Sequence, residues 1–161
     1  MNGAVTAPQA GLRRSGLLIA GFAGAGLLIS LYLTAVKLSG GVPVCGPLAG
    51  CDTVNSSIYS QFMGVPVALF GAVGSAAVLF GALAWWRNGW RSGLLLTYLV
   101  GLASLPVLAY LTYLEIFVIG AICAWCVAYA VTAVLAWLVS LRAMSRRPGA
   151  ARQDAGAGGA A

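Results

Sequence analysis

The 161-residue chain has no histidine and very few charged residues of either sign. Three acids and nine bases make up only 7% of the sequence, whereas charged residues are about 25% of a typical soluble domain. The absence of histidine removes the commonest general base and the commonest metal ligand. Because 61% of the residues are hydrophobic and the mean hydropathy is +0.95, the composition indicates an integral membrane protein.

The formal charge of +6 does not indicate nucleic-acid binding. The basic residues flank apolar segments and are not interleaved with aromatic side chains that could stack on bases. They are better explained as the flanking charges of membrane-spanning helices.

Four apolar segments are long enough to cross a bilayer core of about 30 Å, which takes about 20 helical residues. They cover approximately residues 15–36, 65–86, 92–115 and 122–141. The first is too long for the apolar core of a signal peptide and is expected to be retained as a span. The sequence therefore predicts an all-α integral membrane protein, with one four-helix bundle over residues 15–141.

The distribution of basic residues predicts the orientation of these helices. Eight of the nine bases lie before the first span, between the second and third, or after the fourth, and Lys37 alone lies on the other side. The positive-inside rule makes the eight-base side cytoplasmic. Residues 1–14 are then a cytoplasmic tail, and the Gly/Ala-rich residues 142–161 form a disordered cytoplasmic tail. All four cysteines are expected at the opposite, extracytoplasmic face.

Cys123 and Cys126 form a C-x-x-C pair at the start of the fourth span. Residues three apart share one face of a helix, and the positive end of the helix dipole stabilises a thiolate. We expect Cys123 to be exposed and acidified, with Cys126 about one turn, roughly 5 Å, deeper. The alternative, that both are small buried hydrophobic residues, stays open.

Cys45 and Cys51 lie in a Gly/Pro-rich loop, where cysteines outside the cytoplasm normally form a disulfide. That disulfide could be a structural staple or could shuttle electrons. Two cysteine pairs on one face favour a relay by thiol–disulfide exchange. With no metal-ligand set and no flavin or nicotinamide fold, a lipid-soluble quinone (menaquinone or ubiquinone) is the expected electron acceptor.

The motif CDTVNSSIYSQFMGVPVALFG, followed by the four-span spacing and ICAWCVAY, resembles the bacterial branch of the vitamin K epoxide reductase family. The resemblance covers nearly all of residues 15–141. DsbB-type quinone reductases share this architecture, but they carry the C-x-x-C pair in the first external loop, which is the reverse of the order here. The resemblance implies a four-helix bundle around a quinone, capped in part by a short helix of the external loop.

The same resemblance implies a role for each cysteine. Cys45 would meet the partner, Cys51 would attack Cys123, and Cys126 would transfer electrons to the quinone. Ser57 matches the pocket serine of the family. From the local pattern alone, Ser57 could equally be a helix cap, since the surrounding Asp, Asn and Ser residues all suit that position.

Two positions depart from the pattern of animal members of the family. Ala130 stands where they carry a tyrosine, although Tyr129 is adjacent, and Val67 stands where they carry an asparagine. These departures favour ordinary quinone reduction over epoxide reduction. Several bacterial members also carry a fused thioredoxin-like domain, which this sequence lacks. The expected electron donor is therefore a separate extracytoplasmic thioredoxin-fold (DsbA-like) protein.

Trp125 and Tyr129 join Ser57 as candidates for the quinone site, and Glu115 is a candidate for proton transfer. Trp125, between the two cysteines, is expected to form a wall of the pocket, and Tyr129 to contact the quinone. Glu115 lies near the outer end of the third span, where an acid is costly. It could relay protons to the reduced quinone, or it could reach the interface and stay solvated, which is the interpretation we favour from sequence.

Two other function classes remain as alternatives. Four thiolates could hold a soft metal ion, although an oxidising compartment and the CGPLAGC spacing disfavour it. A membrane scaffold with incidental disulfides is the third. We expect no metal in the relay.

Overall fold

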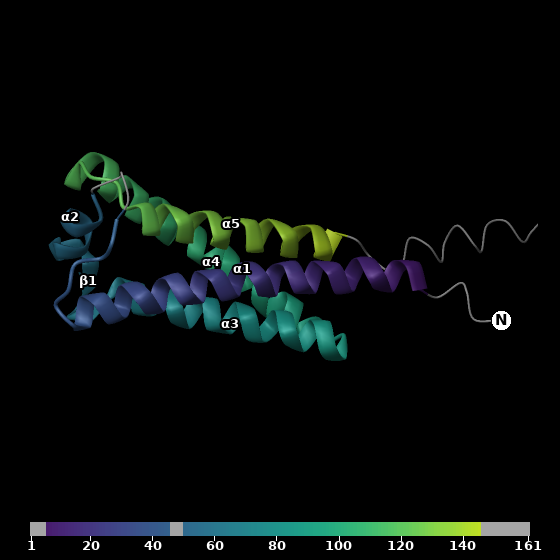
Figure 1. The fold of residues 1–161 in the computed structure, drawn as a ribbon. Helices are drawn as coiled ribbons and strands as arrows, with labels where there is room; N and C mark the ends of the chain where they lie inside the picture. The colour runs from purple at the N-terminus through teal and green to yellow at the C-terminus, as the bar shows by residue number, and fades with distance from the viewer. Residues whose placement is uncertain (1–5, 46–49, 146–161) are drawn as a thin grey trace, which may run out of the picture.

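The computed structural model describes the backbone of residues 6–45 and 50–145, and the side chains of residues 14–45 and 50–145. Its long helices are α1 (Thr6–Leu38), α3 (Val67–Asn88), α4 (Arg91–Tyr113) and α5 (Ala124–Ser145). A π-helical turn, η2 (Leu114–Ile119), continues α4. Between α1 and α3 lie α2 (Cys51–Ser56), the 3₁₀ turn η1 (Ile58–Ser60), β1 (Gln61–Phe62) and β2 (Val65–Pro66) (Figure 1).

The structure confirms the predicted all-α membrane fold. The segments Arg14–Leu38, Val67–Asn88, Arg91–Ile119 and Ala124–Ser145 are long and apolar enough to cross a membrane, with mean hydropathies of 2.0 to 2.1. Their ends differ slightly from the sequence expectation. The second helix begins at Val67 because Val65 and Pro66 form a strand that pairs with β1. The predicted C-terminal tail lies outside the described residues from position 146 onward, and α5 itself continues to Ser145.

The four long helices form a bundle in which α1 contacts α3 and α5, α3 contacts α4, and α4 contacts α5. Small residues allow the backbones to approach closely, as expected for helices packed in lipid. At the crossing of α3 and α4, a methyl group on Gly81 would lie 2.6 Å from the carbonyl oxygen of Gly93. The reciprocal distance, from a methyl group on Gly93 to the carbonyl oxygen of Gly81, is also 2.6 Å. Any side chain at either position would push the two helices apart.

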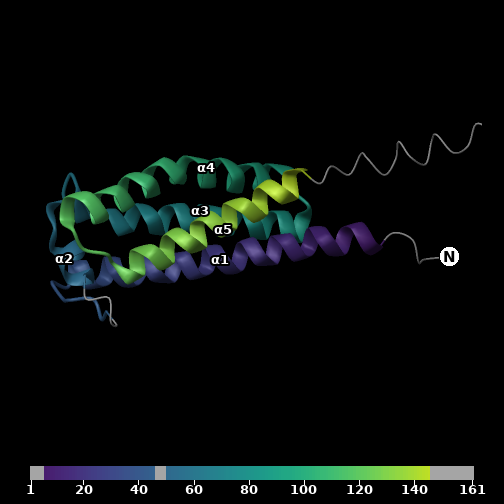
Figure 2. The same ribbon diagram turned by 90° about the horizontal axis from the view of Figure 1, so that it is seen from above.

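The short elements all gather at one end of the bundle, together with the end of α1 and the start of α5 (Figures 1 and 2). The beginning of α1, the connection from α3 to α4 and the end of α5 lie at the opposite end (Figure 2). In the β1–β2 hairpin Phe62 pairs with Val65, and Gly64, with φ +83°, makes the tight turn possible. Both cysteine pairs therefore lie at the same end of the molecule, as the sequence predicts.

Candidate active site

Cys45 and Cys51 form the disulfide that the sequence predicts. Cys51 is the first residue of α2 and is fully buried, with 0% of its surface exposed, whereas Cys45 is half-buried. Of the two sulfurs, that of Cys45 is thus the one that an incoming thiol can reach more easily. Cys123 and Cys126 are free thiols in this structure.

Cys123 immediately precedes α5 and caps its first turn. Its carbonyl oxygen accepts the N–H of Val127 at 3.0 Å, and its sulfur accepts the N–H of Cys126 at 3.4 Å. This is the position and the bonding pattern of an N-cap residue, with sulfur in place of the usual oxygen. The cap explains why the two thiols, three residues apart, lie side by side.

The expectation that Cys123 would be exposed is wrong: only 2% of its surface is accessible, and Cys126 is the more accessible of the two. Cys123 is covered because the loop carrying α2 packs against the residue before it. The pKa of Cys123 is lowered, as expected. The hydrogen bond from the Cys126 thiol, reinforced by the backbone N–H groups of Cys126 and Trp125, lowers the pKa of Cys123 from 9.0 to about 7.

A contact without intervening side chains joins the loop to the start of α5. A methyl group built on Gly50 would lie 2.5 Å from the carbonyl oxygen of Ile122 and 2.8 Å from its nitrogen. Gly50 directly precedes Cys51, and Ile122 directly precedes Cys123. The peptide backbones of the two cysteine-bearing segments are therefore in direct contact, which only glycine at position 50 permits.

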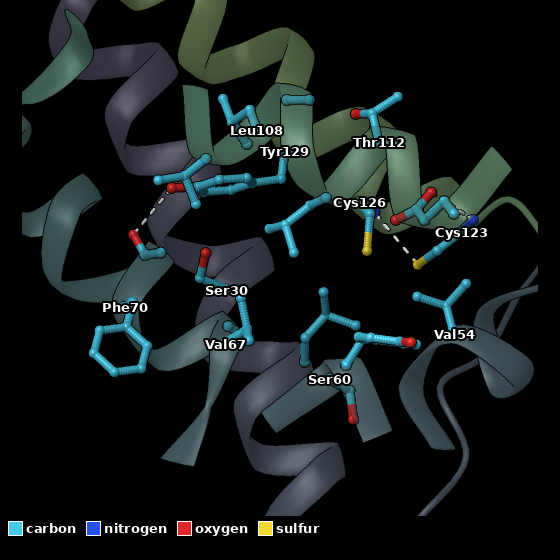
Figure 3. Close-up of a pocket in the computed structure, with 18 of the residues that line it drawn as sticks. Ser30, Val54, Ser60, Val67, Phe70, Leu108, Thr112, Cys123, Cys126 and Tyr129 are labelled. Atoms are coloured by element: carbon cyan, nitrogen blue, oxygen red, sulfur yellow. Dashed lines mark hydrogen bonds between the residues drawn. The ribbon is translucent and has the colours of Figure 1, made fainter. Parts of the chain in front are cut away.

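Next to the free thiols lies a cavity of about 360 Å³, within the usual size range for small-molecule sites. It extends between the helices and is closed on one side by α2 and η1. Figure 3 shows the sulfurs of Cys123 and Cys126 directed toward it, with Val54 of α2 facing Cys123. Its walls are mainly apolar and include Leu33, Val67, Phe70, Gly71, Val100, Ala103, Val107, Leu108, Leu111, Ile119, Val127 and Ala130.

Glu115 is buried at the edge of this cavity, with 7% of its surface exposed, so the expectation that it reaches the interface and stays solvated is wrong. It lies in η2, where the wider π-helical turn replaces the regular α-helix. Its Oε2 accepts the N–H of Cys123 at 3.3 Å, and its carboxyl group also interacts with the Cys126 thiol. One carboxyl group thus contacts both residues of the C-x-x-C pair.

Two of the three predicted quinone-site residues line the cavity. Ser57 does so, but its hydroxyl donates to the carbonyl of Val54 at 2.7 Å at the end of α2, so it acts as a helix cap as well as a wall. Tyr129 also lines the cavity, and its hydroxyl donates to the carbonyl of Gly71 at 3.2 Å. Both side chains help shape the space while their hydroxyl protons are engaged with backbone.

Trp125 does not line the cavity. Its ring lies 5.0 Å from that of Tyr32, centroid to centroid, and its Nε1 donates to the carbonyl of Val44 at 2.9 Å. Because Trp125 follows Cys123 by two residues, its side chain leaves α5 on a different face from Cys126. It ties the segment before Cys45 to the start of α5.

Lys37 is a cavity residue that sequence reasoning left without a role. Its ammonium group donates to the carbonyl of Asn55, which joins the end of α1 to the last turn of α2, and both residues line the cavity. The available signal was that Lys37 is the only basic residue on its side of the predicted topology. This contact holds α2 across the mouth of the cavity.

A metal site has no support in the part of the chain that the structure describes. No group of three or more His, Cys, Asp or Glu side chains gathers there, and two of the four cysteines are joined to each other. The arrangement is instead that of two dithiol pairs in contact, beside an apolar cavity with one carboxyl group.

Comparison with protein families agrees with this arrangement. Residues 17–141 match the sequence model described as the vitamin K epoxide reductase family. The match includes all four cysteines, Glu115 and nearly the whole of the four-helix bundle.

Proposed function

The chain belongs to the vitamin K epoxide reductase family, and from this we propose that it passes electrons from a reduced thioredoxin-fold partner through its two cysteine pairs to a membrane quinone. Membership in the family makes it a membrane thiol–disulfide oxidoreductase. The finer proposal concerns the direction of electron flow, the acceptor and the role of each residue. Its net result is a disulfide made in the partner and a quinone reduced to quinol.

The observation that carries the proposal is the contact between the two cysteine segments beside the cavity. Gly50 lies against the backbone of Ile122, so the buried Cys51 and Cys123 are each one residue away from a direct backbone contact. Thiol–disulfide exchange requires one sulfur to approach another. The backbone contact between the neighbouring residues keeps Cys51 and Cys123 in the same part of the molecule, which supports exchange between them.

In the first step the partner is oxidised. A partner thiolate attacks the more accessible Cys45, the Cys45–Cys51 bond breaks, and Cys51 leaves as a thiolate. The second thiol of the partner then attacks the sulfur that is bound to Cys45. The partner leaves with a disulfide, and two electrons remain on Cys45 and Cys51 as a pair of thiols.

In the second step the electrons pass between the two pairs. With the inner pair oxidised, the Cys51 thiolate attacks Cys123, the Cys123–Cys126 bond breaks, and Cys126 leaves. Cys45 then attacks Cys51 and releases Cys123, which restores the Cys45–Cys51 disulfide. The lowered pKa of Cys123 favours this release, because a more acidic thiol is a better leaving group.

In the third step the inner dithiol reduces the quinone. Cys126, half-buried in the cavity wall, is the thiol that reacts with the ring, and re-forming the Cys123–Cys126 disulfide supplies two electrons. Two protons must reach the quinone oxygens at the same time. Glu115 contacts both cysteines, so we assign it the transfer of a thiol proton toward the quinone.

The proposed location follows from the distribution of basic residues. Arg14 lies in the first part of α1, Arg87 and Arg91 lie at the connection from α3 to α4, and Arg142 lies near the end of α5. These parts of the helices are at the end of the bundle remote from the short elements that carry Cys51 and from the start of α5 (Figure 2). The positive-inside rule makes that end cytoplasmic, in a plasma or inner membrane. Both termini would then be cytoplasmic, and the cysteines would meet an extracytoplasmic DsbA-like partner in an oxidising compartment.

Quinone consumption tests the proposal directly. Purified protein is mixed with short-chain ubiquinone or menaquinone, and absorbance of the quinone is followed after a reduced thioredoxin-fold protein of the DsbA type is added. We expect catalytic loss of the quinone band and one partner disulfide per quinone consumed. No consumption with either quinone above the rate seen without the protein would refute the proposal.

Replacement of Gly50 by alanine tests whether the backbone contact matters for exchange between the pairs. The added methyl group would meet the Ile122 peptide, which cannot give way as a side chain can. Since reacting groups must be held within about 0.5 Å of the productive geometry, we expect turnover to fall about tenfold. Oxidation of the partner by the existing Cys45–Cys51 disulfide, measured as a single turnover, should keep its wild-type rate.

The matched control for Gly50→Ala is Gly41→Ala in the same loop. A methyl group there would meet nothing closer than the Ser39 hydroxyl at 3.3 Å. It should leave both rates unchanged. Equal loss of turnover in the two variants, or normal turnover in Gly50→Ala, would show that the contact does not position Cys51.

A further inference from the structure

Ser30 is the buried hydroxyl of the cavity that has no hydrogen-bond partner among the described residues. It lies on α1, lines the cavity and is 3% exposed. Four other hydroxyls of the cavity wall donate to backbone carbonyls, namely those of Ser57, Ser60, Ser104 and Tyr129. The two remaining ones, of Tyr59 and Thr112, belong to exposed residues. Figure 3 shows the Ser30 hydroxyl directed into the space between α1, α3 and Tyr129.

Two features of the surroundings leave this hydroxyl free to meet a ligand. A serine within a helix usually bonds the carbonyl of a preceding turn, which Ser30 does not do. Gly71 of α3 faces it so closely that a methyl group there would lie 3.0 Å from the Ser30 oxygen. Glycine at position 71 therefore keeps the hydroxyl uncovered. Among the described residues the fully enclosed polar side-chain atom without a partner is Nε1 of Trp137, so the Ser30 oxygen is not sealed by protein and opens on the cavity. Its natural partner is a polar atom bound there.

We propose that the Ser30 hydroxyl donates a hydrogen bond to one carbonyl oxygen of the bound quinone. This assignment rests on the proposed function. A quinone ring carries two carbonyl oxygens on opposite sides, and Ser30 and Cys126 come from different helices that line the same cavity (Figure 3). Cys126 and Glu115 then serve one side of the ring, and Ser30 holds the oxygen on the other side.

The residues around Ser30 leave few other donors for that oxygen. Val67 and Ala130 contribute apolar walls, and the proton of the Tyr129 hydroxyl is directed to the carbonyl of Gly71. The oxygen gains negative charge as the ring accepts electrons, and hydrogen bonds to charged acceptors are shorter and stronger than those to neutral ones. Ser30 should therefore favour reduction as well as binding.

The test compares Ser30→Ala with Ser104→Ala, using menadione and short-chain ubiquinone as probes. Ser104 also lines the cavity, but its hydroxyl donates to the carbonyl of Val100 at 2.6 Å. We expect Ser30→Ala to raise the KM for the quinone about tenfold, and Ser104→Ala to change it by less than about twofold. Exchange between the two cysteine pairs should stay at the wild-type rate in both variants.

Infrared spectroscopy of a quinone labelled with ¹³C at one carbonyl gives an independent readout. In the wild-type protein one carbonyl band should be shifted to lower frequency, and Ser30→Ala should return that band toward its frequency in an apolar solvent. An unchanged band, or equal effects of the two serine substitutions, would overturn the assignment. If the wild-type protein binds and reduces no quinone, the proposed function itself fails, which is a distinguishable result.

Discussion

Replacing Cys126 by serine is expected to abolish quinone reduction and to leave Cys51 and Cys123 joined by a disulfide. The inner pair can no longer form its own disulfide, so the rate should fall on the order of 10³-fold or more. The Cys123 thiolate can still attack Cys51 in the Cys45–Cys51 disulfide. One S–S bond forms, one breaks, and Cys45 leaves as a thiolate. Without a thiol at position 126, the Cys51–Cys123 disulfide can be lost only by return attack of Cys45 on Cys51, which alkylation of the freed Cys45 thiolate blocks.

Trypsin digestion without reductant identifies this linkage. Arg87 and Arg91 are the only basic residues between Cys51 and Cys123. Cleavage there separates the fragment that contains Cys51 from the fragment that contains Cys123, unless a disulfide joins them. In Cys126→Ser the fragments should stay together until dithiothreitol is added.

Cys123→Ser is the matched control for this experiment. It also removes one cysteine of the inner pair, but it leaves the Cys45–Cys51 disulfide within a single fragment. Its fragments should separate without reductant. If the fragments of Cys126→Ser also separate, the two pairs do not exchange electrons. A purely structural role of the Cys45–Cys51 disulfide then becomes the better explanation.

Glu115→Gln is expected to slow quinone reduction about 100-fold, the range over which a positioned proton-transfer group acts. Glutamine keeps an oxygen that can accept the N–H of Cys123, so the local structure should persist. It cannot take up and release a proton near neutral pH. Single-turnover absorbance of the prereduced protein with quinone measures this step without the partner.

Two further measurements separate proton transfer from a structural role of Glu115. Trapping of the Cys51–Cys123 disulfide in the Cys126→Ser background should be unaffected by Glu115→Gln. Thr112→Val, which changes another polar residue of the cavity wall one helical turn away, should keep near-wild-type quinone reduction. A Glu115→Gln protein with a normal reduction rate would remove Glu115 from the mechanism, and an equal loss of trapping would make it a structural residue.

Much of the site could be predicted because its signals are local in the sequence. The C-x-x-C spacing at a helix start predicts two adjacent thiols, and the hydrogen bond from the Cys126 thiol is the main cause of the lowered pKa of Cys123. The Cys45–Cys51 disulfide closes a short loop and needs no knowledge of the rest of the fold. Trp125 shows the opposite case. Its position between the two cysteines predicted that it would form part of the cavity wall. Its side chain instead leaves the helix in another direction and contacts Tyr32 and the loop.

The sequence by itself determined the membrane class, the four helices and the side-by-side thiols, because hydropathy and helical spacing act over short stretches of chain. Only the tertiary structure decided the burial of Cys123 and Glu115, the backbone contact of Gly50 with Ile122, and the free hydroxyl of Ser30. Each of these depends on segments far apart in the sequence. Their relative placement is set by packing of whole helices, which no local pattern records.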